Sequence, residues 1–161
     1  MKKKRVKNQT PPLNAEEARA YAFLLLKFRL RSESELKFRL VRKGFSESLA
    51  CATVDFLKEK KFIDDDLFAR NWAVSRLKRP FGLVRIRREL AQKGVPEAVV
   101  RGALDQVKEG YREDKVVAQL AEKKFAQLKG VEPLKARARV YGYLMRRGFS
   151  PEVVGEAVSK L

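Results

Sequence analysis

The sequence predicts an all-α protein, built as an elongated array of three tandem three-helix repeats. Three observations point to this fold class. Apolar residues recur at helical spacing, no stretch alternates in the way a strand does, and one pattern of apolar residues and glycine occurs three times. A repeat of about 50 residues buries little surface by itself, so we expect neighbouring repeats to pack together.

The repeated pattern consists of apolar positions around one glycine, which stands where a helix would end in a left-handed C-cap. A basic residue precedes the glycine in each copy. The second copy follows the first by 50 residues, and the third follows the second by 54. The copies are Leu36, Leu40, Gly44, Phe45, Leu49 and Val54; Ile86, Leu90, Gly94, Val95, Val99 and Leu104; and Val140, Leu144, Gly148, Phe149, Val153 and Val158.

The helices of the first repeat are delimited by capping residues. Asn14 is a suitable N-cap for a helix over residues 15–29, and Ser32 is suitable for a second helix that ends at Gly44. Ser46 then begins the third helix. The opening helices of the later repeats match this one less closely, and we expect them at residues 66–78 and 114–128. The predicted organisation is a basic tail at 1–14 and repeats at 15–63, 64–110 and 111–161.

The composition excludes several kinds of site. The chain has no histidine, which removes the commonest general base and metal ligand, and Cys51 alone can form neither an intrachain disulfide nor a thiolate cluster. Lysine and arginine number 37 against 20 acidic residues, a net charge of +17. Polyanions are the usual partners of such a surface. We expect no catalytic residue, no metal and no cofactor.

The N-terminal residues 1–13 carry a charged start without the apolar core of a secretory signal. The basic run at residues 2–7 is compatible with a flexible arm or, as an alternative, with a nuclear address. No stretch approaches the roughly 18 apolar residues that a membrane span needs. These features favour a protein of the cytoplasm that does not insert into a membrane.

Three consecutive aspartates at residues 64–66 form the densest acidic cluster. One hypothesis is a divalent-metal site of a nuclease, which would require oxygen ligands gathered from separated positions. The favoured interpretation is that Asp64, Asp65 and Asp66 cap a helix and compensate its dipole.

Several aromatic residues could offer stacking faces for nucleic-acid bases. Their helical spacing is more typical of a core stripe, and we expect the single tryptophan to contribute to the core. These residues are Phe62, Phe68, Trp72, Tyr111 and Phe125.

The second helix of every repeat is rich in basic residues. A solvated helix face normally mixes charges of both signs, whereas most acids here fall in the third helices and the caps. In residues 83–93 the apolar stripe of Leu83, Ile86 and Leu90 predicts that Arg85 and Arg88 point away from the core. The repetition favours an extended surface for polyanions or acidic proteins over a merely solvated face, without implying sequence readout.

Three segments together resemble the RecX family, the bacterial regulators of the RecA recombinase. They are RSESELKFRLVRKGF at residues 31–45, FIDDDLFARNWAVSRL at 62–77 and GLVRIRRELAQKGV at 82–95. The resemblance spans about residues 15–161 and is weakest in the third repeat. It implies a non-enzymatic protein that binds in the groove of the RecA–DNA filament and inhibits it, so that recombination, DNA repair and SOS activities of the filament fall.

The resemblance implies as partners the RecA filament and the phosphate backbone of single-stranded and duplex DNA, and we expect a monomer. Two alternatives are a nucleic-acid-binding protein with helix-turn-helix-like units that acts without RecA, and the nuclease considered above. The residues expected to contact RecA or DNA are Arg42, Lys43, Arg76, Lys78, Arg79, Arg85, Arg87, Arg88, Lys93, Arg146 and Arg147.

Overall fold

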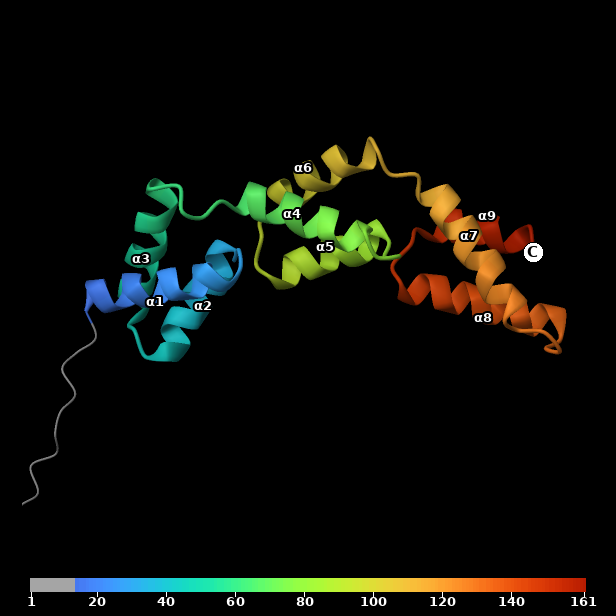
Figure 1. The fold of residues 1–161 in the computed structure, drawn as a ribbon, viewed down its shortest axis with the longest axis horizontal. Helices are drawn as coiled ribbons and strands as arrows, with labels where there is room; N and C mark the ends of the chain where they lie inside the picture. Colours follow the sequence, from blue (N-terminus) through green and yellow to red (C-terminus); the bar gives the residue numbers. More distant parts are fainter. Residues whose placement is uncertain (1–13) are drawn as a thin grey trace, which may run out of the picture. The chain divides into compact units, whose positions relative to one another are not determined.

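The computed structural model describes residues 14–161, and within them every regular element is an α-helix (Figure 1). The all-α, repeated architecture is therefore confirmed. The expected tail at residues 1–14 lies, apart from Asn14, outside the described residues. The helices are α1 (Ala15–Phe28), α2 (Glu33–Lys43), α3 (Glu47–Glu59), α4 (Asp65–Leu77), α5 (Leu83–Gln92), α6 (Glu97–Lys108), α7 (Glu113–Ala126), α8 (Pro133–Arg146) and α9 (Pro151–Ser159).

The predicted caps begin the three helices of the first repeat. The side chains of Asn14, Ser32 and Ser46 each accept a hydrogen bond from the backbone amide three residues later. Asn14 also forms a reciprocal capping box with Glu17, a contact that was not predicted from the sequence. These polar caps are local, so they fix where each helix begins without help from tertiary packing.

The repeated glycines end the second helices as predicted. Gly44, Gly94 and Gly148 have φ angles of 111°, 71° and 77°, in the left-handed region that side chains disfavour. At Gly44 the amide donates to the Val41 carbonyl, and the next amide donates to the Leu40 carbonyl. This pattern satisfies carbonyls that a helix end otherwise leaves without partners.

The chain divides into two compact units between Ile63 and Asp64. In the first unit, α1, α2 and α3 enclose one apolar core, which includes Leu36, Leu40 and Leu57. The second unit contains two cores, one made by α4, α5 and α6 and the other by α7, α8 and α9 (Figure 1). No helix within residues 14–161 is long and apolar enough to cross a membrane.

Inside the second unit, the start of α5 docks on the end of α8. The amide of Gly82 donates to the Arg147 carbonyl at 2.9 Å, and the amide of Val84 donates to the Gly148 carbonyl at 3.1 Å. A side chain at Gly82 would collide with the carbonyl of Gly148. Amides at the start of α5, which have no acceptor within their own helix, thus bond to carbonyls at the end of α8, which have no donor within theirs. The positive end of the α5 dipole also meets the negative end of the α8 dipole.

Candidate nucleic-acid interface

The middle repeat contains a cluster of basic side chains around one carboxylate, Glu89. The Nε of Arg76 lies 2.7 Å from Glu89 Oε2, and the Nε of Arg85 lies 2.9 Å from Oε1. The indole N–H of Trp72 donates to Oε2 at 3.1 Å. The Glu89 side chain is only 15% exposed, so this carboxylate ties α4 to α5 in a partly dehydrated setting.

The surroundings of Glu89 favour its ionised form. Burial opposes ionisation, but the hydrogen bonds from Arg85 and Trp72 and the charge of Arg76 outweigh it, so the pKa of Glu89 lies below its ordinary value of 4.5. Glu89 consequently remains charged at neutral pH. It holds Arg76 and Arg85 in fixed positions and neutralises part of their charge.

The prediction that Arg85 and Arg88 point away from the core is correct for Arg88 and only partly correct for Arg85. Arg88 is exposed. Arg85 is only partly exposed, because its side chain turns along the helix to Glu89 four residues later. Arg87 pairs with Glu97 at 3.2 Å, with both side chains more than half exposed, so this pair contributes little stability.

Other predicted contact residues lie over aromatic rings. The cation of Lys93 is 4.3 Å from the Trp72 ring centroid, and that of Arg147 is 4.6 Å from the ring of Tyr143. Arg42 lies over Phe38 at 5.5 Å, and Lys43 lies over Tyr21 at 5.6 Å. Such contacts hold a cation in place.

Trp72 packs partly against the core, as expected for the single tryptophan. It stacks on Phe68, with ring centroids 5.9 Å apart, and is partly buried. The guanidinium of Arg76 and the ammonium of Lys93 both lie over its ring. Its indole is thus committed to internal contacts, which argues against Trp72 as a platform for nucleic-acid bases.

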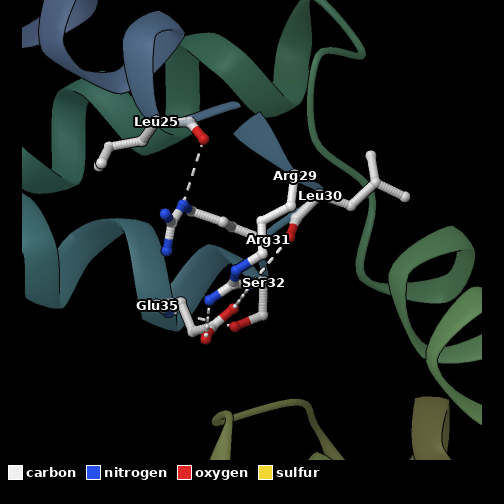
Figure 2. Close-up of polar contacts among 6 residues, drawn as sticks. All are labelled: Leu25, Arg29, Leu30, Arg31, Ser32 and Glu35. Carbon is white, nitrogen blue, oxygen red and sulfur yellow. Dashed lines mark hydrogen bonds and ion pairs between the residues drawn. The ribbon is translucent and has the colours of Figure 1, made fainter. Parts of the chain in front are cut away.

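The turn between α1 and α2 fixes two further arginines (Figure 2). The guanidinium of Arg29 binds the Glu35 carboxylate at 2.8 Å and donates to the Leu30 carbonyl. The hydrogen bond to Glu35 raises the pKa of Arg29. Arg31 donates to the Leu25 carbonyl in the last turn of α1, and burial lowers the pKa of Arg31. Arg29 and Arg31 thus tie α1 to α2 and stabilise the first repeat.

The remaining predicted residues are exposed and have no ion-pair or aromatic partner in the described part of the chain. They flank the Glu89 cluster or end α8. Because no carboxylate neutralises them, they are the best placed to contact phosphates through charge-assisted hydrogen bonds. They are Lys78, Arg79, Arg88 and Arg146.

The aspartate run caps α4, as favoured above. Asp64 Oδ1 accepts hydrogen bonds from the amides of Asp66 at 2.8 Å and Leu67 at 3.0 Å. Asp65 is buried, and Asp66 lies in the first turn of the helix. Within residues 14–161 no group of three or more acidic or thiol side chains is arranged to hold a metal ion.

The prediction of contact residues from sequence missed Glu89, which ends the acid-free run of residues 67–88. Its spacing to Arg85 is that of a helical i to i+4 ion pair, and this signal was available in the sequence. Its contacts with Trp72 and Arg76 join different helices, and no local pattern indicates them.

Comparisons with known proteins agree with this architecture. Three family models match the chain: the first three-helix domain of RecX at residues 18–57, the second at 64–104 and the third at 113–158. The regulatory protein RecX of Chlorobium limicola is 33% identical over 146 residues, which cover 90% of this chain and 89% of the relative. That of Pasteurella multocida is 33% identical over 133 residues, or 82% of this chain and 80% of the relative.

Solved structures show the same fold. A crystal structure of regulatory protein RecX matches with a TM-score of 0.82 at 23% identity, over 91% of this chain and 73% of that one. RecX from Lactobacillus salivarius matches with a TM-score of 0.79 at 18% identity, over 91% and 96% of the two chains. By its sequence similarity over most of its length, the chain belongs to the RecX family of regulatory proteins.

Proposed function

We propose that this protein regulates the RecA recombinase by binding in the groove of the RecA–DNA filament and limiting filament extension. The observation that carries the proposal is membership of the RecX family, with similarity over 90% of the chain. The recombination, DNA-repair and SOS activities that depend on the filament would fall with it. The protein would act by occupying the filament as a cytoplasmic monomer, without catalysing a reaction.

The proposed contact is electrostatic. The exposed cations Lys78, Arg79 and Arg88 of the middle repeat have no neutralising partner among the described residues and would bind DNA phosphates or acidic groups of the filament. Glu89 holds the Nε groups of Arg76 and Arg85 in place, so the other guanidinium N–H groups of these arginines would meet the filament from fixed positions. Phosphate contacts of this kind predict that binding weakens steeply as salt concentration rises.

The test adds the protein to RecA assembled on single-stranded DNA and follows ATP hydrolysis together with filament length in electron micrographs. We expect both to fall as the protein approaches stoichiometric amounts. Unchanged hydrolysis and unchanged filament length at stoichiometric excess would refute the proposal.

A second candidate function is direct binding of nucleic acid without RecA, which the unpaired cations also favour. It predicts tight binding to duplex DNA by the protein alone. A titration of fluorescent duplex DNA at several salt concentrations separates the two, since the filament regulator needs RecA for its tight binding.

A further inference from the structure

A second basic site lies where the third repeat meets the second, beside the Glu89 cluster, since Arg147 of this site and Arg85 both lie over the ring of Phe81. It is a hollow of about 230 Å³ between α7, α8 and the loop that joins α4 to α5. Every charged residue that lines it is positive. Its lining consists of Pro80, Leu120, Lys123, Lys124, Gln127, Tyr143 and Arg147.

The cations of this hollow are held by contacts from separate elements. The guanidinium of Arg147 lies over the Tyr143 ring at 4.6 Å and donates to the Pro80 carbonyl at 3.0 Å. The ammonium of Lys124 lies 5.5 Å from the same ring and donates to the Gln127 side chain at 3.4 Å. These contacts keep two cations close together although they repel each other, because an aromatic ring and neutral oxygens attract both.

Helix-dipole compensation accounts for only part of this arrangement. Lys123 and Lys124 lie in the last turn of α7, where a cation is favoured in any helix. Arg147 is the C-cap of α8, where the same effect favours a cation, but the dipoles do not explain why the ends of α7 and α8 meet at one hollow. The acid next to the lysines in sequence, Glu122, lines a different hollow together with Asp114 and other residues. Acidic side chains thus line the hollow on one side of α7, whereas the hollow that contains Lys123, Lys124 and Arg147 has none.

The size and lining of the hollow define its ligand. Pockets that enclose a whole small molecule measure about 300–1,000 Å³, so this one is small for a complete nucleotide. The Tyr143 ring has cations over it, which leaves it poorly suited to stack on a base. What remains is a convergence of an arginine fork and two ammonium groups, which matches a phosphate group and its oxygens.

We propose that Lys123, Lys124 and Arg147 form a subsite for one backbone phosphate of a nucleic-acid strand. The subsite adds Lys123 and Lys124 to the contact residues and gives Arg147 a defined role. It rests on the proposed function, since the strand would be the one that the RecA filament carries. Because it binds a backbone group, it contributes affinity and position without sequence preference.

The test measures binding of the full-length protein to fluorescein-labelled oligothymidine and to a mixed-base strand, by anisotropy at several salt concentrations. Lys123→Gln with Lys124→Gln should weaken binding to both strands by the same factor. It should also reduce the slope of log affinity against log salt by about 0.7, the value for one single-strand phosphate contact. Lys123→Arg with Lys124→Arg keeps both charges and should bind as the wild type does.

The matched control is Lys115→Gln with Lys160→Gln, which removes two lysines from the hollow on the other side of α7. An equal loss in the control and in the Lys123/Lys124 variant would overturn the subsite, because it would show a dependence on total charge alone. If the Lys123/Lys124 variant binds DNA as the wild type does but no longer binds poly-glutamate, the subsite is also overturned. The hollow would then be assigned to an acidic protein.

The same preparations separate this proposal from the proposed function. If the wild type inhibits RecA while the Lys123/Lys124 variant binds DNA normally, the subsite is wrong and RecA regulation stands. If the variant binds both strands more weakly with the reduced salt slope while the wild type leaves RecA unaffected, the subsite stands and RecA regulation is wrong.

Discussion

At the scale of single residues, Glu89 determines which arginines of the middle repeat are free to bind a partner. It accepts hydrogen bonds from Arg76, Arg85 and the indole of Trp72, whereas Arg88, one position away, remains exposed. A count of charges along the chain treats these arginines alike. Their different surroundings separate arginines that stabilise the repeat from those that can reach phosphates.

Replacing Glu89 by glutamine should destabilise the protein by about 1–3 kcal/mol, because two arginines lose a charged acceptor in a partly buried site. Chemical denaturation measures this loss. Glu97→Gln, which removes the carboxylate from an exposed pair with Arg87, should cost under about 1 kcal/mol.

The Glu89 effect should depend on pH. Since the folded state lowers the pKa of Glu89, the stabilisation is present above the ordinary value of 4.5 and disappears as pH falls through the lower folded pKa. The difference in stability between wild type and Glu89→Gln should therefore shrink on acidification. A difference that stays constant from pH 7 to pH 3 would contradict this assignment.

At the scale of helices, local signals predicted most boundaries. The expected helix at 15–29 is Ala15–Phe28, and the helices expected at 66–78 and 83–93 are Asp65–Leu77 and Leu83–Gln92. Caps and apolar stripes lie within a few residues of each other, which makes them readable in a sequence. The docking of Gly82 on Gly148 joins residues far apart in the chain, and no local pattern contains it.

Gly82→Ala should destabilise the second unit by about 1–3 kcal/mol, because a methyl group there overlaps the Gly148 carbonyl. Thermal and urea unfolding monitor the change. Gly102→Ala is the matched control, since a side chain at this position in α6 meets nothing within 4 Å. It should stabilise the helix by about 0.5–1 kcal/mol. Equal effects of the two substitutions would show that the docking does not matter.

At the scale of the whole molecule, the chain consists of two units with separate cores. The cores of the second unit consist of residues after Asp64, among them Phe68, Leu90 and Leu144. Repetition in the sequence predicted the three-helix pattern. It also led us to expect that neighbouring repeats pack together, but not that the second and third in particular form one unit, because that grouping depends on the contacts between α5 and α8.

A fragment of residues 64–161 should fold without the first unit. Its apolar cores are complete, and its internal docking between α5 and α8 is retained. We expect helical circular dichroism and a cooperative thermal transition. A fragment without a cooperative transition would show that the first unit is needed for the second to fold.

The measurement that bears most directly on the proposed function is ATP hydrolysis by RecA on single-stranded DNA, with the wild type and two charge-reversal pairs. Arg79→Glu with Arg88→Glu changes cations proposed to contact the filament, and Arg101→Glu with Lys115→Glu changes exposed cations outside that set. We expect the wild type and the second pair to suppress hydrolysis at the same concentration, and the first pair to require on the order of tenfold more. Full hydrolysis in the presence of excess wild-type protein, or equal suppression by all three proteins, would contradict the proposed mode of binding.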